Sequence, residues 1–112
     1  YLIVYQDGAD SDHGYVAVVT VTGTTPSMAT PVKFLSAACV QPKIVYDSGV
    51  ADAFVMVFVD GGNSSHARAI AGVVSGTSVS FGTAITFNSN ANNQLTTIIS
   101  ADPNNRGSYI PY

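Results

Sequence analysis

The sequence repeats itself at a spacing of 53 residues, and this repeat constrains the fold more than any other feature. When residues 1–41 are written above residues 54–94 without a gap, fourteen of the 41 aligned positions are identical. After residue 94 the register slips by about two residues, and a third copy begins near Tyr109. Repeats of this kind fold as similar units that pack on their neighbours. We therefore predict one repeat over 1–53, a second over 54–107, and the first strand of a third over 108–112.

Each repeat contains four apolar segments of strand length, separated by turn residues. The expected strands are 1–6, 15–22, 29–35 and 43–46 in the first repeat, and 54–59, 68–75, 80–88 and 95–100 in the second. Turns are expected over 7–12 and 60–65, because Asp, Asn, Gly and Ser favour turn conformations. A polar stretch is expected to separate the third strand from the fourth.

The first strand of the second repeat, 54–59, is apolar at every position. A strand buried on both faces has this pattern. Four short strands in ~50 residues, the first of them buried, are typical of a β-propeller blade. The predicted fold class is all-β, with four-stranded antiparallel blades of a β-propeller. A β-solenoid or a sheet fibre is the alternative architecture.

The composition agrees with a β-protein and excludes several functions. Only 10% of the 112 residues are charged, the net charge is -3, and all seven acidic residues are Asp. Residues that favour surface helices are scarce, which argues against a helical fold. The charge excludes nucleic-acid binding through bulk electrostatics, and no apolar run reaches the ~20 residues of a membrane-spanning helix. The single cysteine, Cys39, forbids an internal disulfide.

The second repeat resembles a repeat found in tail-fibre-like and other virion-associated proteins of bacteriophages. The resemblance rests on the apolar strand that ends in Asp60, the Gly/Asn/Ser turn after it, and the hairpin Val-Ser-Gly-Thr-Ser-Val-Ser-Phe-Gly-Thr at 74–83. The first repeat departs from this pattern, with Pro26 and Met28 at the positions of Val79 and Phe81.

The resemblance implies a non-enzymatic structural or receptor-binding component of a phage virion, either a tail fibre or a tail-associated display protein. Such a component is located on the virion or outside the cell. It would contact a cell-surface glycan or a neighbouring virion protein. The alternative is a secreted extracellular fibre subunit or adhesin that polymerises through its open terminal strands.

The two turns supply the candidate ligand-binding residues. These are Asp7, Asp10, Asp12 and His13 in the first copy, and Asp60, Asn63 and His66 in the second. Calcium takes several Asp and Asn oxygens from one loop, but no bidentate Glu is present, and turn chemistry alone explains these residues. We therefore predict neither a metal site nor a cofactor, and calcium is the one ion that the turns suggest.

No catalytic set is predicted. The two histidines flank turns, and neither a nucleophile motif nor a phosphate-binding loop occurs in the sequence. The chain is therefore expected not to be an enzyme.

Both ends of the chain are apolar, whereas termini are usually polar and frayed. We expect these ends to be assembly strands, and the chain to be a processed subunit or a piece of a longer protein. The residues are Tyr1, Leu2, Ile3, Val4 and Tyr5 at the start, and Tyr109, Ile110 and Tyr112 at the end. The predicted partners are further copies of the repeat, in the same chain or in a homo-oligomer.

Overall fold

The structure, a computed structural model, describes residues 1–46, 50–90, 100–101 and 108–109, the last two pairs by their backbone. Ile110 and Tyr112 of the predicted assembly strand lie outside the described residues. The described part is all-β and has no α-helix. It therefore contains no helix of the length and apolarity that a membrane crossing requires.

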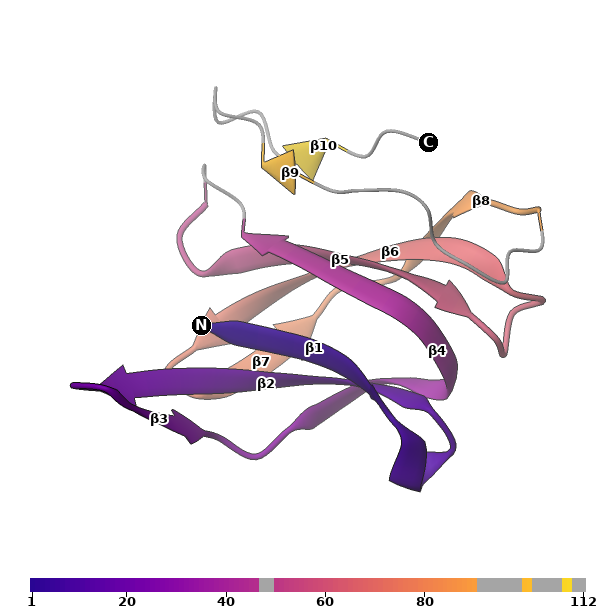
Figure 1. Ribbon diagram of the computed structural model, residues 1–112. Helices are drawn as coiled ribbons and strands as arrows, with labels where there is room; N and C mark the ends of the chain where they lie inside the picture. The colour runs from indigo at the N-terminus through magenta and orange to yellow at the C-terminus, as the bar shows by residue number, and fades with distance from the viewer. Residues whose placement is uncertain (47–49, 91–99, 102–107, 110–112) are drawn as a thin grey trace.

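The strands form one large open antiparallel sheet and one small sheet (Figure 1). The strands are β1 (Leu2–Asp7), β2 (His13–Thr22), β3 (Thr25–Met28), β4 (Val32–Tyr46), β5 (Ala53–Asp60), β6 (His66–Ser75), β7 (Ser78–Phe81), β8 (Ile85–Asn88), β9 (Ser100–Ala101) and β10 (Ser108–Tyr109). A short 3-10 helix, η1 (Gly8–Asp10), follows β1. The order in the large sheet is β1-β2-β4-β5-β6-β7, with β3 paired to β2 and β8 paired to β6. The small sheet pairs β9 with β10.

The backbone repeats at the same spacing as the sequence. Strands β2, β3 and β4 begin at residues 13, 25 and 32, and β6, β7 and β8 begin at 66, 78 and 85, each 53 residues later. The left-handed turn glycines are Gly23 and Gly76, with φ of 64° and 63°. Two pairs of non-glycine residues in the preceding turns match as well: Ser11 and Ser64, with φ of 55° and 54°, and Asp12 and Ser65, with φ of 60° and 57°. The turn residues therefore impose the same local conformation in both copies.

One long strand replaces the third and fourth strands predicted for the first repeat. β4 runs without a break for 15 residues, so the predicted division into strands 29–35 and 43–46 is wrong. The polar stretch stays extended because a register shift between Val40 and Lys43, with Gln41 at φ 49°, absorbs the irregularity. A short strand that the sequence did not predict, β3, follows the Gly23 turn and pairs with the end of β2.

The strand order does not confirm the predicted propeller blades. In a four-stranded blade, strands that follow one another in sequence would lie side by side. Here β3 and β4 both pair with β2, on its second and first halves. The second half of β4 then pairs with β5 of the next repeat. The two repeats therefore share one strand, and the sheet continues from one to the other.

The sheet bends at β4, so that β1 and β2 lie under β5 and β6 (Figure 1). Apolar side chains from both sides of the bend form the main core: Val16, Cys39, Phe54, Met56, Phe58 and Ile70. Phe34 of β4 joins the two repeats. The centroid of its ring lies 5.2 Å from the ring centroid of Phe58 and 6.3 Å from that of Phe81. As predicted, β5 is buried on both faces, and a second cluster lies on its other side, around Val57 and Val59.

Candidate functional site

The two predicted turns lie at the same end of the molecule, on either side of β4. The amide of Cys39 donates a hydrogen bond to the carbonyl of Asp12 in the first turn, at 2.8 Å. The amide of Gly61, in the second turn, donates to the carbonyl of Ala38 at 2.8 Å. Because these two β4 residues are adjacent, the strand holds both turns at one end of the sheet.

The recurring aspartate of each copy caps its own turn. Asp7 Oδ1 accepts a hydrogen bond from the amide of Ala9 at 2.9 Å. In the second copy, Asp60 Oδ1 accepts from the amide of Gly62 at 2.9 Å. This arrangement satisfies turn amides that would otherwise lack a partner. These carboxylates therefore set the conformation of the turns that carry the other polar residues.

Polar side chains of β2 and β4 converge on Asp10 of the first turn. Its Oδ2 accepts a hydrogen bond from the Tyr15 hydroxyl at 2.6 Å and lies 2.6 Å from Lys33 Nζ. His13 Nδ1 lies 3.2 Å from the same oxygen and 3.2 Å from Lys33 Nζ. Nδ1 accepts from Lys33 when it carries no hydrogen, and donates to Asp10 when it does.

An aromatic pair continues this group across the sheet. The rings of Tyr5 and Tyr15 stack with their centroids 5.8 Å apart and an angle of 18° between their planes. Lys33 Nζ lies 5.5 Å from the Tyr15 ring centre, within the range of a cation–π interaction. We call Tyr5, Asp10, His13, Tyr15 and Lys33 the first-turn cluster. It combines aromatic faces with an acceptor and a cationic donor, all at least partly accessible to solvent.

Electrostatics keep the cluster ionised over a wide range of pH. Hydrogen bonds from Lys33 and Tyr15 lower the pKa of Asp10 to about 2. The same contacts raise the pKa of Tyr15, mainly through its hydrogen bond to Asp10. They also raise the pKa of Lys33, again mainly through Asp10. Near neutral pH the cluster therefore holds a carboxylate, an ammonium group and a neutral phenol.

The second copy has a different polar arrangement on the same backbone. Arg68 stands where Tyr15 stands in the first copy, and its Nη1 lies 2.9 Å from Asp60 Oδ2. Arg68 Nη2 also donates to the carbonyl of Ala84 at 3.2 Å. Asp60 is only 3% exposed, so its carboxylate is buried, whereas the Arg68 side chain is 25% exposed. The equivalent of Lys33 is Thr86, which brings no charge to the second turn.

The remaining candidate ligand residues are not drawn into either group. Asp12 Oδ1 accepts from Gln6 Nε2 at 3.3 Å. Asn63 contributes its backbone to the second turn, where its carbonyl accepts from the amide of His66 at 3.0 Å. Among the described residues, no three His, Cys, Asp or Glu side chains come together in a group that could hold a metal ion.

The first predicted assembly strand is β1 with the residue before it. Leu2 and Val4 pack against the main core, whereas Ile3 is 47% exposed and Tyr1 is 80% exposed. At the other end, Tyr109 lies in β10 and its backbone pairs with Ser100. The sequence interpretation therefore groups together residues whose side chains face opposite sides of the strand.

Sequence reasoning missed Lys33 and Arg68 as site residues. Lys33 reaches the first turn because β4 pairs with β2, which places it opposite Tyr15. That pairing skips β3, and nothing local in the sequence indicates it. One available signal was the alignment of the two repeats, in which Tyr15 matches Arg68 and Lys33 matches Thr86. These positions change chemical character within an otherwise similar repeat.

The lone cysteine lies in the core and not at the turns. Cys39 is fully buried, and burial raises the pKa of its thiol to about 12, with a further contribution from the nearby Asp60 charge. A thiol in this state is a poor nucleophile and a poor metal ligand.

Comparisons with protein-family models, curated proteins and solved structures give no match to this chain.

Proposed function

We propose that the protein is a non-enzymatic structural and receptor-binding component of a phage virion, of the tail-fibre or tail-associated display type. The observation that carries the proposal is the contrast between the two copies. Their turns share left-handed residues at equivalent positions, yet they present different polar side chains. A scaffold that repeats while its exposed residues vary suits display on a particle surface.

The candidate contact region is the first-turn cluster, and its proposed ligand is a cell-surface glycan. Aromatic rings with a polar tip offer an apolar face and a hydrogen-bonding group together, which suits sugar rings. The Asp10 carboxylate and the Lys33 ammonium provide an acceptor and a donor 2.6 Å apart. Two neighbouring hydroxyl groups of a sugar can donate a hydrogen bond to such an acceptor and accept one from such a donor.

The arrangement of repeats in the whole particle is part of the same proposal. The two repeats stack across a bend in a shared sheet, and successive repeats related by the same rotation would continue that stack. A constant rotation closes a ring when it divides a full turn, and otherwise produces a filament. We propose the closed, propeller-type ring as the arrangement in the virion.

The secreted fibre subunit remains the second candidate, and one observation favours it. In the described part of the chain, β1 pairs with β2 alone, whereas its copy β5 pairs with both β4 and β6. An edge strand with one free side is a template for strand addition.

The experiment is a binding assay of the protein on an array of bacterial surface glycans. We expect the wild type to bind, and Asp10→Asn and Tyr15→Phe to weaken binding by about tenfold each, which corresponds to ~1.4 kcal/mol. Asn63→Ala, at the Asp10 position of the second copy, is the matched control and should bind as the wild type does. If no glycan is bound, or if all variants bind equally, this site is not the receptor contact. An antibody that labels purified phage particles separates the virion proposal from the secreted one.

A further inference from the structure

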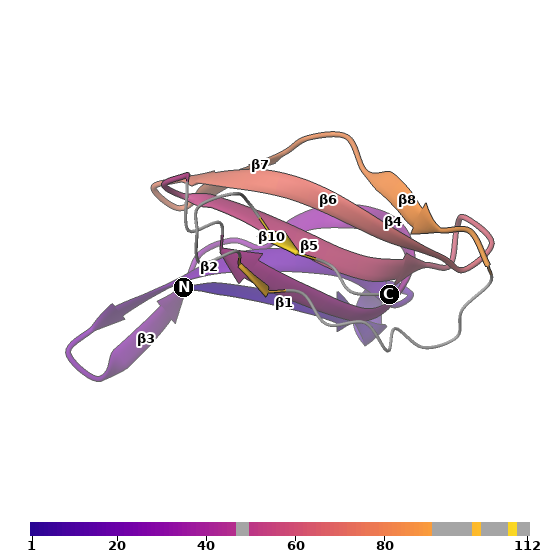
Figure 2. The same cartoon turned by 90° about the horizontal axis from the view of Figure 1, so that it is seen from above.

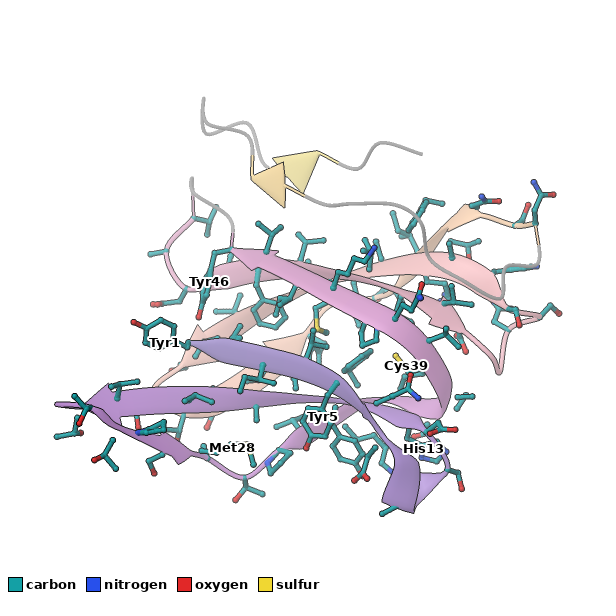
Figure 3. All side chains as sticks on the ribbon, in the orientation of Figure 1. Tyr1, Tyr5, His13, Met28, Cys39 and Tyr46 are labelled. Atoms are coloured by element: carbon teal, nitrogen blue, oxygen red, sulfur yellow. The ribbon has the colours of Figure 1, made fainter. Side chains whose placement is uncertain are left out.

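The β2–β3 hairpin carries apolar side chains that no other described element covers. It projects from the body of the protein (Figure 2). Val21 near its tip is 48% exposed, and Met28 at its end is 56% exposed. Met28 lies on the side of β2 that faces away from β5 and β6 (Figure 3). An apolar hairpin that projects into water is a candidate interaction surface.

The copy of this hairpin in the second repeat is a packing element. β6–β7 has the same register as β2–β3, since the pair Gly72 and Phe81 lies 53 residues after the pair Val19 and Met28. Its apolar residues Val74, Val79 and Phe81 pack against the main core. Strand β7 also lies next to β2 of the first repeat. The hairpin of one repeat therefore covers the repeat that precedes it.

The surface that receives the β6–β7 hairpin also has a copy, and no hairpin in the described part of the chain covers it. In the first repeat, Leu2, Val16 and Val32 belong to the same core cluster as the hairpin residues. Their equivalents 53 residues later are Val55, Ala69 and Ile85. A hollow of about 220 Å³ lies here, lined by Val55, Ala69, Ile70, Ala71, Thr83 and Ile85. Ile85 is 62% exposed.

We propose that the β2–β3 hairpin of one copy of the chain docks into this hollow on a second copy. The two surfaces are copies of the two halves of the interface that already joins the repeats within the chain. Met28 would stand in the position of Phe81, and Val21 in that of Val74. The contact is heterologous, because each copy offers a different surface to each neighbour.

Two features favour docking by faces over pairing of strand edges. Pro26 lies in the middle of β3, and proline lacks the amide that a further strand would need. The register that the two hairpins share instead places apolar side chains on one face of the β2–β3 hairpin. In the second repeat, that face is packed while Thr86 at the turn end stays exposed. Docking would therefore leave the first-turn cluster accessible, so this inference does not depend on the proposed glycan binding.

The test is the mass of the chain in solution, measured by light scattering over a range of concentrations. Met28→Asp blocks the hairpin and Ile85→Asp blocks the hollow, both at exposed positions that leave the core intact. We expect the wild type to exceed one chain mass as concentration rises. Each variant alone should remain at one chain mass. Val50→Asp, at an exposed position outside both surfaces, should associate as the wild type does.

An equimolar mixture of the two variants gives the decisive result. The intact hollow of Met28→Asp can accept the intact hairpin of Ile85→Asp, and neither end of that pair can extend further. We expect the mixture to reach two chain masses and to stop there. A monomeric wild type overturns the proposal. So does self-association of either variant alone, because this would indicate a symmetric contact or a different surface.

Discussion

Asp10 is the residue on which the first-turn cluster depends. Lys33, Tyr15 and His13 all contact its Oδ2, whereas its copy Asn63 has no charge to offer. The cluster is therefore a property of the first repeat alone. Single substitutions here should alter local electrostatics and leave the core unchanged.

The pKa of Asp10 should be measurable through its carboxyl carbon in an NMR titration. We expect a midpoint of about 2 in the wild type. In Lys33→Met the pKa should rise toward the ordinary aspartate value of about 3.9, because the largest contribution to the shift is lost. The folded-state pKa is lowered, so the stabilising contribution is complete above the unfolded value and is lost as pH falls through about 2. An ordinary midpoint in the wild type would mean that the Lys33 contact does not form in solution.

Arg68 should matter more to stability than any residue of the first-turn cluster. It pairs with Asp60, which is buried, so Arg68→Met would leave a carboxylate within the protein without its cation. Loss of one partner of a buried pair costs about 3 kcal/mol. We expect urea unfolding to show a fall of this size in the free energy of unfolding. The value lies at the low end for a buried pair, because part of the Arg68 side chain is exposed.

The double variant Arg68→Met with Asp60→Asn provides the control for this effect. Removal of the carboxylate charge should recover part of the lost stability, because the unpaired buried charge causes most of the loss. An unchanged unfolding midpoint in Arg68→Met would show that the pair contributes nothing.

At the scale of elements, the two repeats differ in the size of the residue on the second strand that faces the first aromatic residue. Gly72 lies under the ring of Phe54, which is fully buried. The equivalent residue in the first repeat is Val19, and the equivalent aromatic residue, Tyr1, is 80% exposed. The Tyr1 side chain therefore lies outside the core, whereas that of its copy Phe54 lies within it.

Gly72→Ala should therefore destabilise the protein. The added Cβ would contact the Phe54 ring and lie 2.7 Å from the Ser80 carbonyl oxygen, which is backbone and cannot move easily. Overpacking of this kind costs about 2 kcal/mol. The matched control is Gly82→Ala, whose Cβ would meet only the Ala71 carbonyl oxygen at 3.7 Å. Equal thermal unfolding of the two variants would contradict the close packing at Gly72.

The sequence predicts an element where the signal lies within that element. It misses strand pairings between segments that lie far apart in the sequence. The apolar run at 54–59 and the Gly-Thr pairs at 23–24 and 76–77 mark β5 and the two tight turns correctly, whereas the strands expected after those turns, 29–35 and 80–88, are wrong. The continuity of β4 could not be predicted, because Gln41 and Pro42 interrupt its apolar pattern and its partner β5 belongs to the next repeat. For the same reason Asp10 and His13 could be identified from the turn, whereas Lys33 could not. Only the pairing of β4 with β2 brings it near.

At the scale of the whole molecule, the repeats form one unit and not two separate domains. Phe34 from the shared strand lies against Phe58 and Phe81 of the second repeat. The shared strand also places both polar turns at the same end. Any further repeat that packs in the same way would add a turn at that end, and the proposed receptor contact would become multivalent only where that turn carries the side chains of the first-turn cluster.

The central claim is that β4 belongs to both repeats, and cross-strand nuclear Overhauser effects on isotope-labelled protein test it most directly. The structure predicts contacts from Ile44 to Met56 and from Val45 to Val55 on one side, and from Lys33 to Tyr15 on the other. The separate four-stranded blade requires β4 to pair with β3 in place of β5. Contacts between β3 and β4, with none between Val45 and Val55, would contradict the shared strand and the stacking of repeats that depends on it.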